Sequence, residues 1–222
     1  MDFDKARFNM IEQQIRPWNV LNPQVLSLLS EVKREGFVCE TLQSLAFTDC
    51  ELPIRAQEKN TGEFMLSPKM EARMLQELAL TQSDNVLEVG TGTGYTAALM
   101  AQQAGRVTTV EINPNIAELA RHNLKRNGLP QVKVLDGCGF DLSSNLGLFD
   151  VLVLSGSSPV LPSTLLAFLK PGGRFIGIIG QAPTMQLVLA HKTAQGEITS
   201  TPLFETHAPC LQNAPNAPAF VF

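Results

Sequence analysis

The chain has 222 residues, of which 44% are hydrophobic, so it can bury the core of one complete domain. Its formal net charge of −4 and its pI near 5.4 lack the basic excess that marks nucleic-acid-binding proteins. Its four cysteines show no C-x-x-C spacing and no paired histidines, so we expect neither a metal site nor a disulfide scaffold.

The opening residues and the apolar runs indicate where the protein works. The first ten residues, MDFDKARFNM, are charged and lack the apolar stretch of a signal peptide. No uninterrupted apolar run reaches the roughly 18 residues of a membrane span. We therefore expect a cytoplasmic monomer or homodimer that binds neither membranes nor nucleic acid.

Two amphipathic helices are predicted near the N-terminus. The first spans residues 2 to 15 and ends before Pro17. Its apolar stripe is formed by three residues: Phe8, Ile11 and Ile15. The second begins with Asn22 as its N-cap and Pro23 in its first turn. Helical packing alone accounts for this region.

A polar run, RAQEKNTGE, covers residues 55–63 and predicts a surface loop, either a substrate lid or an insertion. The following segment, residues 65–80, predicts a helix with Ser67 at its N-cap and Pro68 in its first turn. Its buried stripe is formed by Met70, Met74, Leu75 and Leu78. Ser67 is also a candidate for a hydroxyl that orients a substrate, although capping alone explains its position.

The most informative stretch is NVLEVGTGTGY, residues 85–95. A short apolar strand ends in three alternate glycines, Gly90, Gly92 and Gly94, and a helical pattern follows at once. This arrangement presents backbone N–H groups and a helix N-terminus to a ligand. Glycine also removes the Cβ that would keep the main chain away from that ligand. A glycine-rich turn without a ligand is the simpler alternative.

The spacing distinguishes between two classes of ligand. The dinucleotide fingerprint G-x-G-x-x-G needs a third glycine where this chain has Tyr95. Glu88, two residues before Gly90, would repel a pyrophosphate but suits a ligand that carries an ammonium and a sulfonium. The pattern E-x-G-x-G-x-G resembles the first motif of the S-adenosylmethionine (AdoMet)-dependent methyltransferases.

Two further strands end in acidic residues. The strand at 106–110 leads to Glu111, which lies 21 positions after Gly90 and near the roughly 20-residue spacing at which a carboxylate binds ribose. The strand at 132–135 leads to Asp136, which can accept from an adenine amino group or simply form an Asp-Gly turn. The candidate cofactor residues are Glu88, Gly90, Thr91, Gly92, Gly94, Tyr95, Glu111, Ile112, Asp136 and Gly137.

The remaining segments continue the alternation of strand and helix, which predicts a parallel sheet covered on both faces. They comprise a strand at 149–154, a loop at 155–159, a helix at 161–169, a turn at 170–173, a strand at 174–179 and hairpin-like strands at 186–189 and 198–203. The fold class is therefore α/β, a three-layer, doubly wound, mostly parallel Rossmann-like sheet. We expect a single domain, with an N-terminal helical lobe (residues 1–80) and an AdoMet-binding core (residues 81–222).

Several segments outside the glycine motif point to one family. They are REGFV (34–38), AFTD (46–49), LPI (52–54), SPKMEARML (67–75), LFDVLVLSGSSP (148–159) and LKPGGRF (169–175). In these segments the chain resembles the protein-L-isoaspartate O-methyltransferases over most of its length. It departs from them at Leu66, where family members usually carry a serine two places before the proline.

The resemblance implies that AdoMet methylates the carboxylate of L-isoaspartyl residues in damaged proteins, which begins their repair. A carboxylate is already ionised near neutral pH, so the reaction needs no general base, and most of the rate comes from alignment. The candidate residues that orient the acceptor are Ser67, Ser155 and Ser157. Two alternatives stay open: a methyltransferase of the same fold with another acceptor, such as a small molecule, and an AdoMet-binding protein without catalysis.

Overall fold

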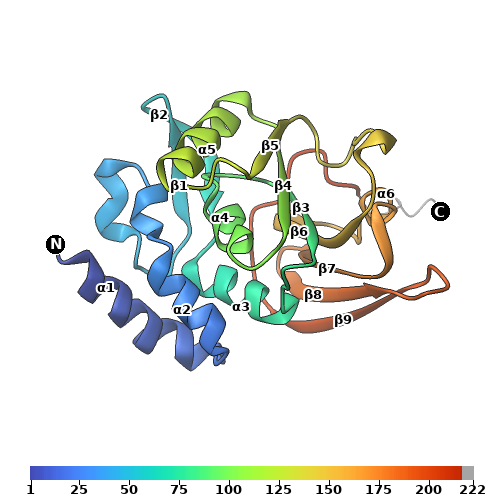
Figure 1. Cartoon of the computed structure of the whole chain (residues 1–222), viewed down its shortest axis with the longest axis horizontal. Coiled ribbons are helices and arrows are strands. Elements are labelled where there is room, and N and C mark those ends of the chain that lie inside the picture. Colours follow the sequence, from blue (N-terminus) through green and yellow to red (C-terminus); the bar gives the residue numbers. More distant parts are fainter. Residues whose placement is uncertain (217–222) are drawn as a thin grey trace.

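The computed structural model describes residues 1–216, and its centre is a seven-stranded sheet with the order β5-β4-β3-β6-β7-β8-β9 (Figure 1). The strands are β3 (Asn85–Val89), β4 (Arg106–Glu111), β5 (Lys133–Asp136), β6 (Phe149–Ser158), β7 (Leu169–Gln181), β8 (Thr184–Lys192) and β9 (Ile198–Glu205). The strands from β5 to β7 in this order run parallel, and β8 and β9 are antiparallel additions. The predicted mostly parallel sheet, finished by a hairpin, is confirmed.

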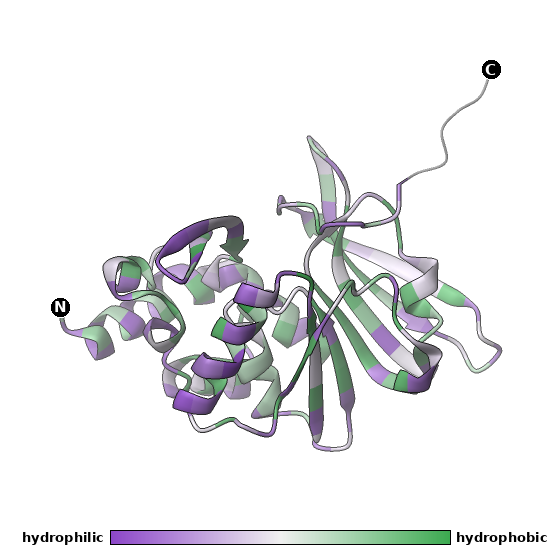
Figure 2. Cartoon of the chain, turned by 90° about the horizontal axis from the view of Figure 1, so that it is seen from above, coloured by the Kyte–Doolittle hydropathy of each residue, from purple (hydrophilic) through white to green (hydrophobic). Residues whose placement is uncertain are grey.

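Helices cover the two faces of the sheet unequally. They are α1 (Phe3–Met10), α2 (Pro23–Glu31), α3 (Pro68–Leu78), α4 (Tyr95–Ala101), α5 (Pro114–Arg126) and α6 (Ser163–Leu166). The larger hydrophobic cluster joins α3, α4 and α5 to one face, together with the N-terminal helices. The smaller cluster covers the other face with α6 and neighbouring loop residues. In Figure 2 hydrophobic residues are frequent in the central strands of the seven-stranded sheet, whereas hydrophilic residues lie along the outward sides of the helices.

The N-terminal helices lie at one side of the molecule and reach the sheet through α3, which contacts both α2 and β7 (Figure 1). The first helix continues beyond α1 as a π-helical turn, Ile11–Ile15, so its predicted length is confirmed. The predicted stripe is wrong at Phe8, which is 63% exposed, while Ile11 and Ile15 are buried. Arg7 takes the inward position instead, because its guanidinium pairs with the carboxylate of Glu35.

The polar run 55–63 is not a loop, which corrects the prediction. It forms most of an antiparallel hairpin, β1 (Leu52–Ala56) and β2 (Lys59–Met65). The two turn residues, Gln57 and Glu58, have φ angles of 50° and 63°. Positive φ at both central residues is the geometry of a tight hairpin turn, which usually selects Asn or Gly. The sequence did not predict the hairpin because neither turn residue is Asn or Gly.

Three boundaries also differ from the prediction. Strand β6 continues through the expected loop 155–159 as far as Ser158, with an irregular register between Val153 and Ser157. The helix expected at 161–169 shrinks to the single turn of α6. The expected turn at 170–173 lies inside β7, which begins at Leu169.

Two further features follow from the described residues. Among residues 1–216, no helix has the length and apolar character needed to cross a bilayer. All four cysteines carry free thiols, at positions 39, 50, 138 and 210.

Candidate active site

The glycine turn follows β3 at the carboxyl edge of the sheet, where open α/β sheets bind their ligands. Gly90, Gly92 and Gly94 have φ angles of 91°, 53° and 86°, a region that residues with a Cβ rarely adopt. A Cβ on Gly94 would also lie 3.2 Å from the Leu124 side chain. Backbone conformation and packing therefore both require glycine at the start of α4.

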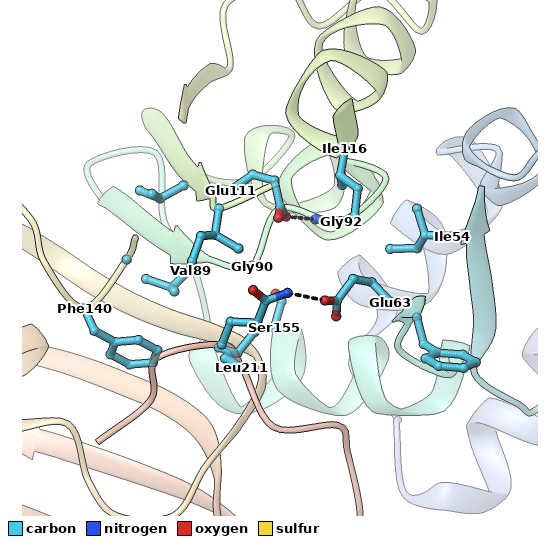
Figure 3. Close-up of a pocket in the computed structure, with 15 residues that line it drawn as sticks. Ile54, Glu63, Val89, Gly90, Gly92, Glu111, Ile116, Phe140, Ser155 and Leu211 are labelled. Atoms are coloured by element: carbon cyan, nitrogen blue, oxygen red, sulfur yellow. Dashed lines mark hydrogen bonds between the residues drawn. The ribbon is translucent and has the colours of Figure 1, made fainter. Parts of the chain in front are cut away.

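Glu111 ends β4 and is held against the glycine turn. One carboxylate oxygen accepts a hydrogen bond from the backbone N–H of Gly92 at 3.0 Å (Figure 3). The other accepts from the backbone N–H of Asn113, also at 3.0 Å. Burial raises the pKa of Glu111, and these backbone donors oppose the rise. The carboxylate is thus fixed in direction before any ligand binds.

Glu88 lies inside β3 and is completely buried. Its register partner on β4 is Thr109, whose hydroxyl donates to Glu88 at 2.7 Å. Ser155 on β6 donates to the other carboxylate oxygen at 2.6 Å. Burial raises the pKa of Glu88 to about 8, although the hydrogen bonds from these two donors act to lower it. Glu88 therefore touches the pocket only through Ser155.

A pocket with about 550 Å³ of space, partly open to solvent, lies above these strand ends. Its lining combines predicted and unforeseen residues: Ile54, Glu63, Phe64, Val89, Gly90, Gly92, Val110, Glu111, Ile112, Ile116, Gly139, Phe140, Ser155, Leu211 and Gln212. Figure 3 shows Glu111 and Glu63 reaching toward it from different elements.

The C-terminal segment 208–212 and the β1–β2 hairpin form the second wall of this pocket. The Gln212 side-chain amide donates to the Glu63 carboxylate at 2.6 Å, which joins two residues far apart in the sequence (Figure 3). Leu211 packs so closely that a Cβ on Gly156 would lie 2.7 Å from its Cδ2. The wall is therefore built by long-range contacts.

Ser157 anchors that C-terminal segment and is completely buried. Its hydroxyl donates to the Ala208 carbonyl at 2.9 Å, and its N–H donates to the Pro209 carbonyl at 2.9 Å. The Leu211 N–H in turn donates to the Ser157 carbonyl at 2.9 Å. The polar groups of Ser157 are therefore used in structure, and its side chain does not line the pocket.

A small second cavity adjoins the pocket behind the glycine turn. Its lining includes Leu66, Glu71, Thr91, Thr93, Tyr95 and Thr96. Arg34 forms a buried ion pair with Glu71 and donates to the Leu66 carbonyl at 2.7 Å. Burial, against the pull of Arg34, raises the pKa of Glu71 to about 7. The Thr96 hydroxyl on α4 also donates to Glu71 at 3.2 Å, which links the ion pair to the helix that follows the glycine turn.

The structure brings part of the predicted set together. Five of the predicted residues line the pocket: Gly90, Gly92, Glu111, Ile112 and Ser155. Asp136 and Gly137 lie outside it and are exposed, and the Asp136 carboxylate pairs with Arg121. Ser67 begins α3 without a side-chain capping bond and lines neither cavity.

Most of the residues that sequence reasoning missed come from three separate segments: the hairpin (Ile54, Glu63, Phe64), the loop after β5 (Gly139, Phe140) and the C-terminal segment (Leu211, Gln212). The other three, Val89, Val110 and Ile116, lie on β3, β4 and α5 beside predicted residues. At Gly139 a Cβ would lie 2.2 Å from the Val89 side chain, so packing against β3 requires glycine there. Like the other missed residues from the three segments, Gly139 reaches the pocket through tertiary contacts that no short motif encodes.

Comparisons with known proteins cover nearly the whole chain. Residues 5–208 match the family model described as protein-L-isoaspartate(D-aspartate) O-methyltransferase. A protein-L-isoaspartate O-methyltransferase of Methanoculleus marisnigri is 34% identical, covering 90% of this chain and 88% of that protein. One from Koribacter versatilis is 33% identical, covering 97% and 94%.

Solved structures show the same fold. A Plasmodium falciparum structure, described as a β-aspartate methyltransferase in complex with S-adenosyl-L-homocysteine, gives a TM-score of 0.77 at 20% identity, covering 96% of this chain and 99% of that one. Another, named protein-L-isoaspartate O-methyltransferase, gives 0.80 at 23% identity, covering 95% and 67%. On the length and identity of the sequence matches, the chain belongs to the protein-L-isoaspartate(D-aspartate) O-methyltransferase family.

Proposed function

We propose that the pocket binds AdoMet and that the protein methylates the carboxylate of L-isoaspartyl residues in damaged proteins. One observation carries this proposal: in a chain that matches the family from residue 5 to residue 208, the glycine turn and Glu111 meet in one pocket. Bound AdoMet would supply a methyl group on a sulfonium. The acceptors would be cytoplasmic proteins, and the protein would act as a monomer or homodimer within one folded domain.

The lining suits AdoMet chemically. The Glu111 carboxylate, already aimed by two N–H groups, would accept from ribose hydroxyls. Ile112 and Phe140 offer apolar walls for an adenine ring. Asp136 would have to release Arg121 before it could accept from the adenine amino group. The glycine turn offers backbone N–H groups to the methionine part.

Ser155 is our leading candidate for orienting the acceptor carboxylate, because its side chain lines the pocket. A hydroxyl has one proton to donate, and in this structure it goes to Glu88. If Glu88 holds its own proton, the carboxyl group can donate to Ser155 instead, which leaves the Ser155 proton for the acceptor. We keep Ser67 and Ser157 as weaker candidates, since their hydroxyls do not line the pocket.

The test is methyl transfer from labelled AdoMet to a synthetic isoaspartyl peptide, with the matching aspartyl peptide as control. We expect base-labile label on the isoaspartyl peptide alone, because a methyl ester hydrolyses in base. AdoMet binding is measured separately by calorimetry. Clear binding without label on the isoaspartyl peptide would reject the acceptor and keep the cofactor.

A methyltransferase with another acceptor is the second candidate, and Leu66 favours it. This apolar residue is buried and lines the cavity beside the pocket. Label on a small amine or hydroxyl compound, and not on the peptide, would support this alternative. AdoMet binding without transfer to any acceptor would instead favour a protein that has lost catalysis.

A further inference from the structure

The pocket has two walls, to which we assign different roles in binding. The glycine turn and Glu111 form the wall that we assign to AdoMet. The opposite wall consists of Ile54 and Glu63 from the hairpin, with Leu211 and Gln212 from the C-terminal segment. With the cofactor held on the first wall, an acceptor enters along the second. The residue chemistry of the second wall therefore decides which acceptors are favoured.

That wall carries one charged side chain. Among the described residues that line the pocket, the charged ones are Glu63 and Glu111, and none is Lys or Arg. Glu111 is held by backbone N–H groups, whereas Glu63 accepts from the neutral amide of Gln212. A neutral partner leaves the negative charge of Glu63 uncompensated. This negative charge also acts on Glu111 across the pocket. Burial is the largest cause of the raised pKa of Glu111, and the charge of Glu63 raises that pKa further.

An isoaspartyl acceptor brings a carboxylate of its own to this wall, where it meets like charge. An acidic residue beside the isoaspartyl group adds to the repulsion, while a Lys or Arg there offsets it by pairing with Glu63. We propose that Glu63 is a specificity-determining residue that selects isoaspartyl acceptors flanked by a basic side chain. This inference rests on the proposed function and names the substrate class within it.

The size of the effect follows from the partial solvation of the wall. Glu63 is half-buried and Gln212 is exposed, so solvent screens the interaction. Unit charges several ångströms apart in such surroundings change binding by about three- to tenfold. Because AdoMet is the same in every assay, the ratio between two peptides isolates the contribution of the acceptor.

The experiment uses three isoaspartyl peptides that differ at one neighbouring position, which is Lys, Ala or Glu. Their kcat/KM values are measured with the wild type, Glu63→Gln and Glu58→Gln. Glu58 is a matched control, since it is an exposed carboxylate on the turn of the same hairpin and does not line the pocket. Thermal melting checks that each variant is folded, and a Glu63→Lys variant reverses the charge.

We expect the wild type and Glu58→Gln to prefer the Lys peptide over the Glu peptide by about tenfold. The preference should fall to about twofold in Glu63→Gln, mainly through KM, and reverse in Glu63→Lys. An unchanged ratio in Glu63→Gln overturns the inference. A raised KM for AdoMet with that ratio unchanged also overturns it, and assigns Glu63 to the cofactor. No methylation of any peptide by the wild type overturns the proposed function itself.

Discussion

Glu88 and Ser155 show how one buried residue can control the direction of a hydrogen bond. Glu88 is inaccessible to solvent, and no cation pairs with it in the described part of the chain. Its raised pKa means that the folded protein holds this proton more tightly than the unfolded chain does. The direction of the Ser155 hydroxyl then depends on that proton.

We predict that Glu88→Gln flattens the pH dependence of stability. The pKa of Glu88 rises from 4.5 to about 8 on folding, so its contribution is complete below pH 4.5 and is lost as pH rises through 8. Relative to wild type, the variant should gain roughly 2–4 kcal/mol between pH 5 and 8.5, since one pKa unit is worth about 1.4 kcal/mol. Urea unfolding across this range is the measurement, and parallel curves for the two proteins would contradict it.

The proton on Glu88 should also affect the pH dependence of activity. As Glu88 ionises above pH 8, Ser155 must donate to it, so kcat/KM for the isoaspartyl peptide should decline on the alkaline side. The Glu88→Ala variant has no carboxyl group to orient the Ser155 hydroxyl. Its kcat/KM should therefore be lower than that of the wild type and should not decline at alkaline pH. A Thr109→Val variant is the comparison, because it removes a donor that lowers the pKa of Glu88 and leaves Ser155 in place, so the decline should move to higher pH. An alkaline limb that persists in Glu88→Ala would assign it to another group.

Among the elements, the β1–β2 hairpin differs most from the sequence prediction. Its turn has positive φ at both Gln57 and Glu58, which costs energy in residues with a side chain. Replacing these two residues with Asn-Gly supplies the preferred sequence of this turn. We predict a gain of roughly 1 kcal/mol in stability, measured by urea unfolding. The reversed order, Gly-Asn, is the control, and equal stability of wild type and Asn-Gly would contradict the prediction.

The elements also show what local patterns can reveal. Glycine spacing and the end of β4 predicted Gly90, Gly92 and Glu111 as site residues, and these three residues line one pocket. The prediction was possible because those signals lie within one strand–turn–helix unit and one strand end. The hairpin was missed because its turn lacks Asn and Gly. The extent of β6 was missed because Ser157 and Ser158 pair with β7 only after an irregular register that begins at Val153, and such an irregularity leaves no periodicity in the sequence.

At the scale of the molecule, Arg174 joins the N-terminal elements to the sheet. From β7 it donates to the last carbonyls of α3, those of Leu78 at 2.5 Å and Ala79 at 3.2 Å, and it pairs with Asp84 at 2.8 Å. The last carbonyls of a helix have no partner within the helix, so this guanidinium satisfies them. One side chain thereby holds α3, the segment before β3 and the sheet together.

We predict that Arg174→Ala lowers the free energy of unfolding by roughly 2–4 kcal/mol. The change removes the cation that pairs with the largely buried Asp84 carboxylate, which keeps its hydrogen bonds from Thr81, and it leaves the two carbonyls at the end of α3 without this donor. Urea unfolding measures this loss. Arg121→Ala is the control, because Arg121 and its partner Asp136 are exposed and the change should cost little. Similar losses in both variants would show that burial does not decide the contribution of these pairs.

Long-range assembly also explains which half of the site could be predicted. The wall that we assign to the cofactor comes from consecutive strand ends, so motif spacing is enough to find it. The opposite wall joins Glu63 to Gln212, and only the folded chain shows that they meet. The family resemblance singles out Leu66, but only the structure shows that this residue lines the second cavity.

The C-terminal segment determines at which stage of protein synthesis the pocket can be completed. Residues 208–212 leave the ribosome after all seven strands of the sheet, and they supply Leu211 and Gln212 to the pocket. A nascent chain can therefore complete its sheet while one wall of the binding site consists of the β1–β2 hairpin alone. The newly made protein acquires its finished site only when this late segment has been released and has paired with Ser157.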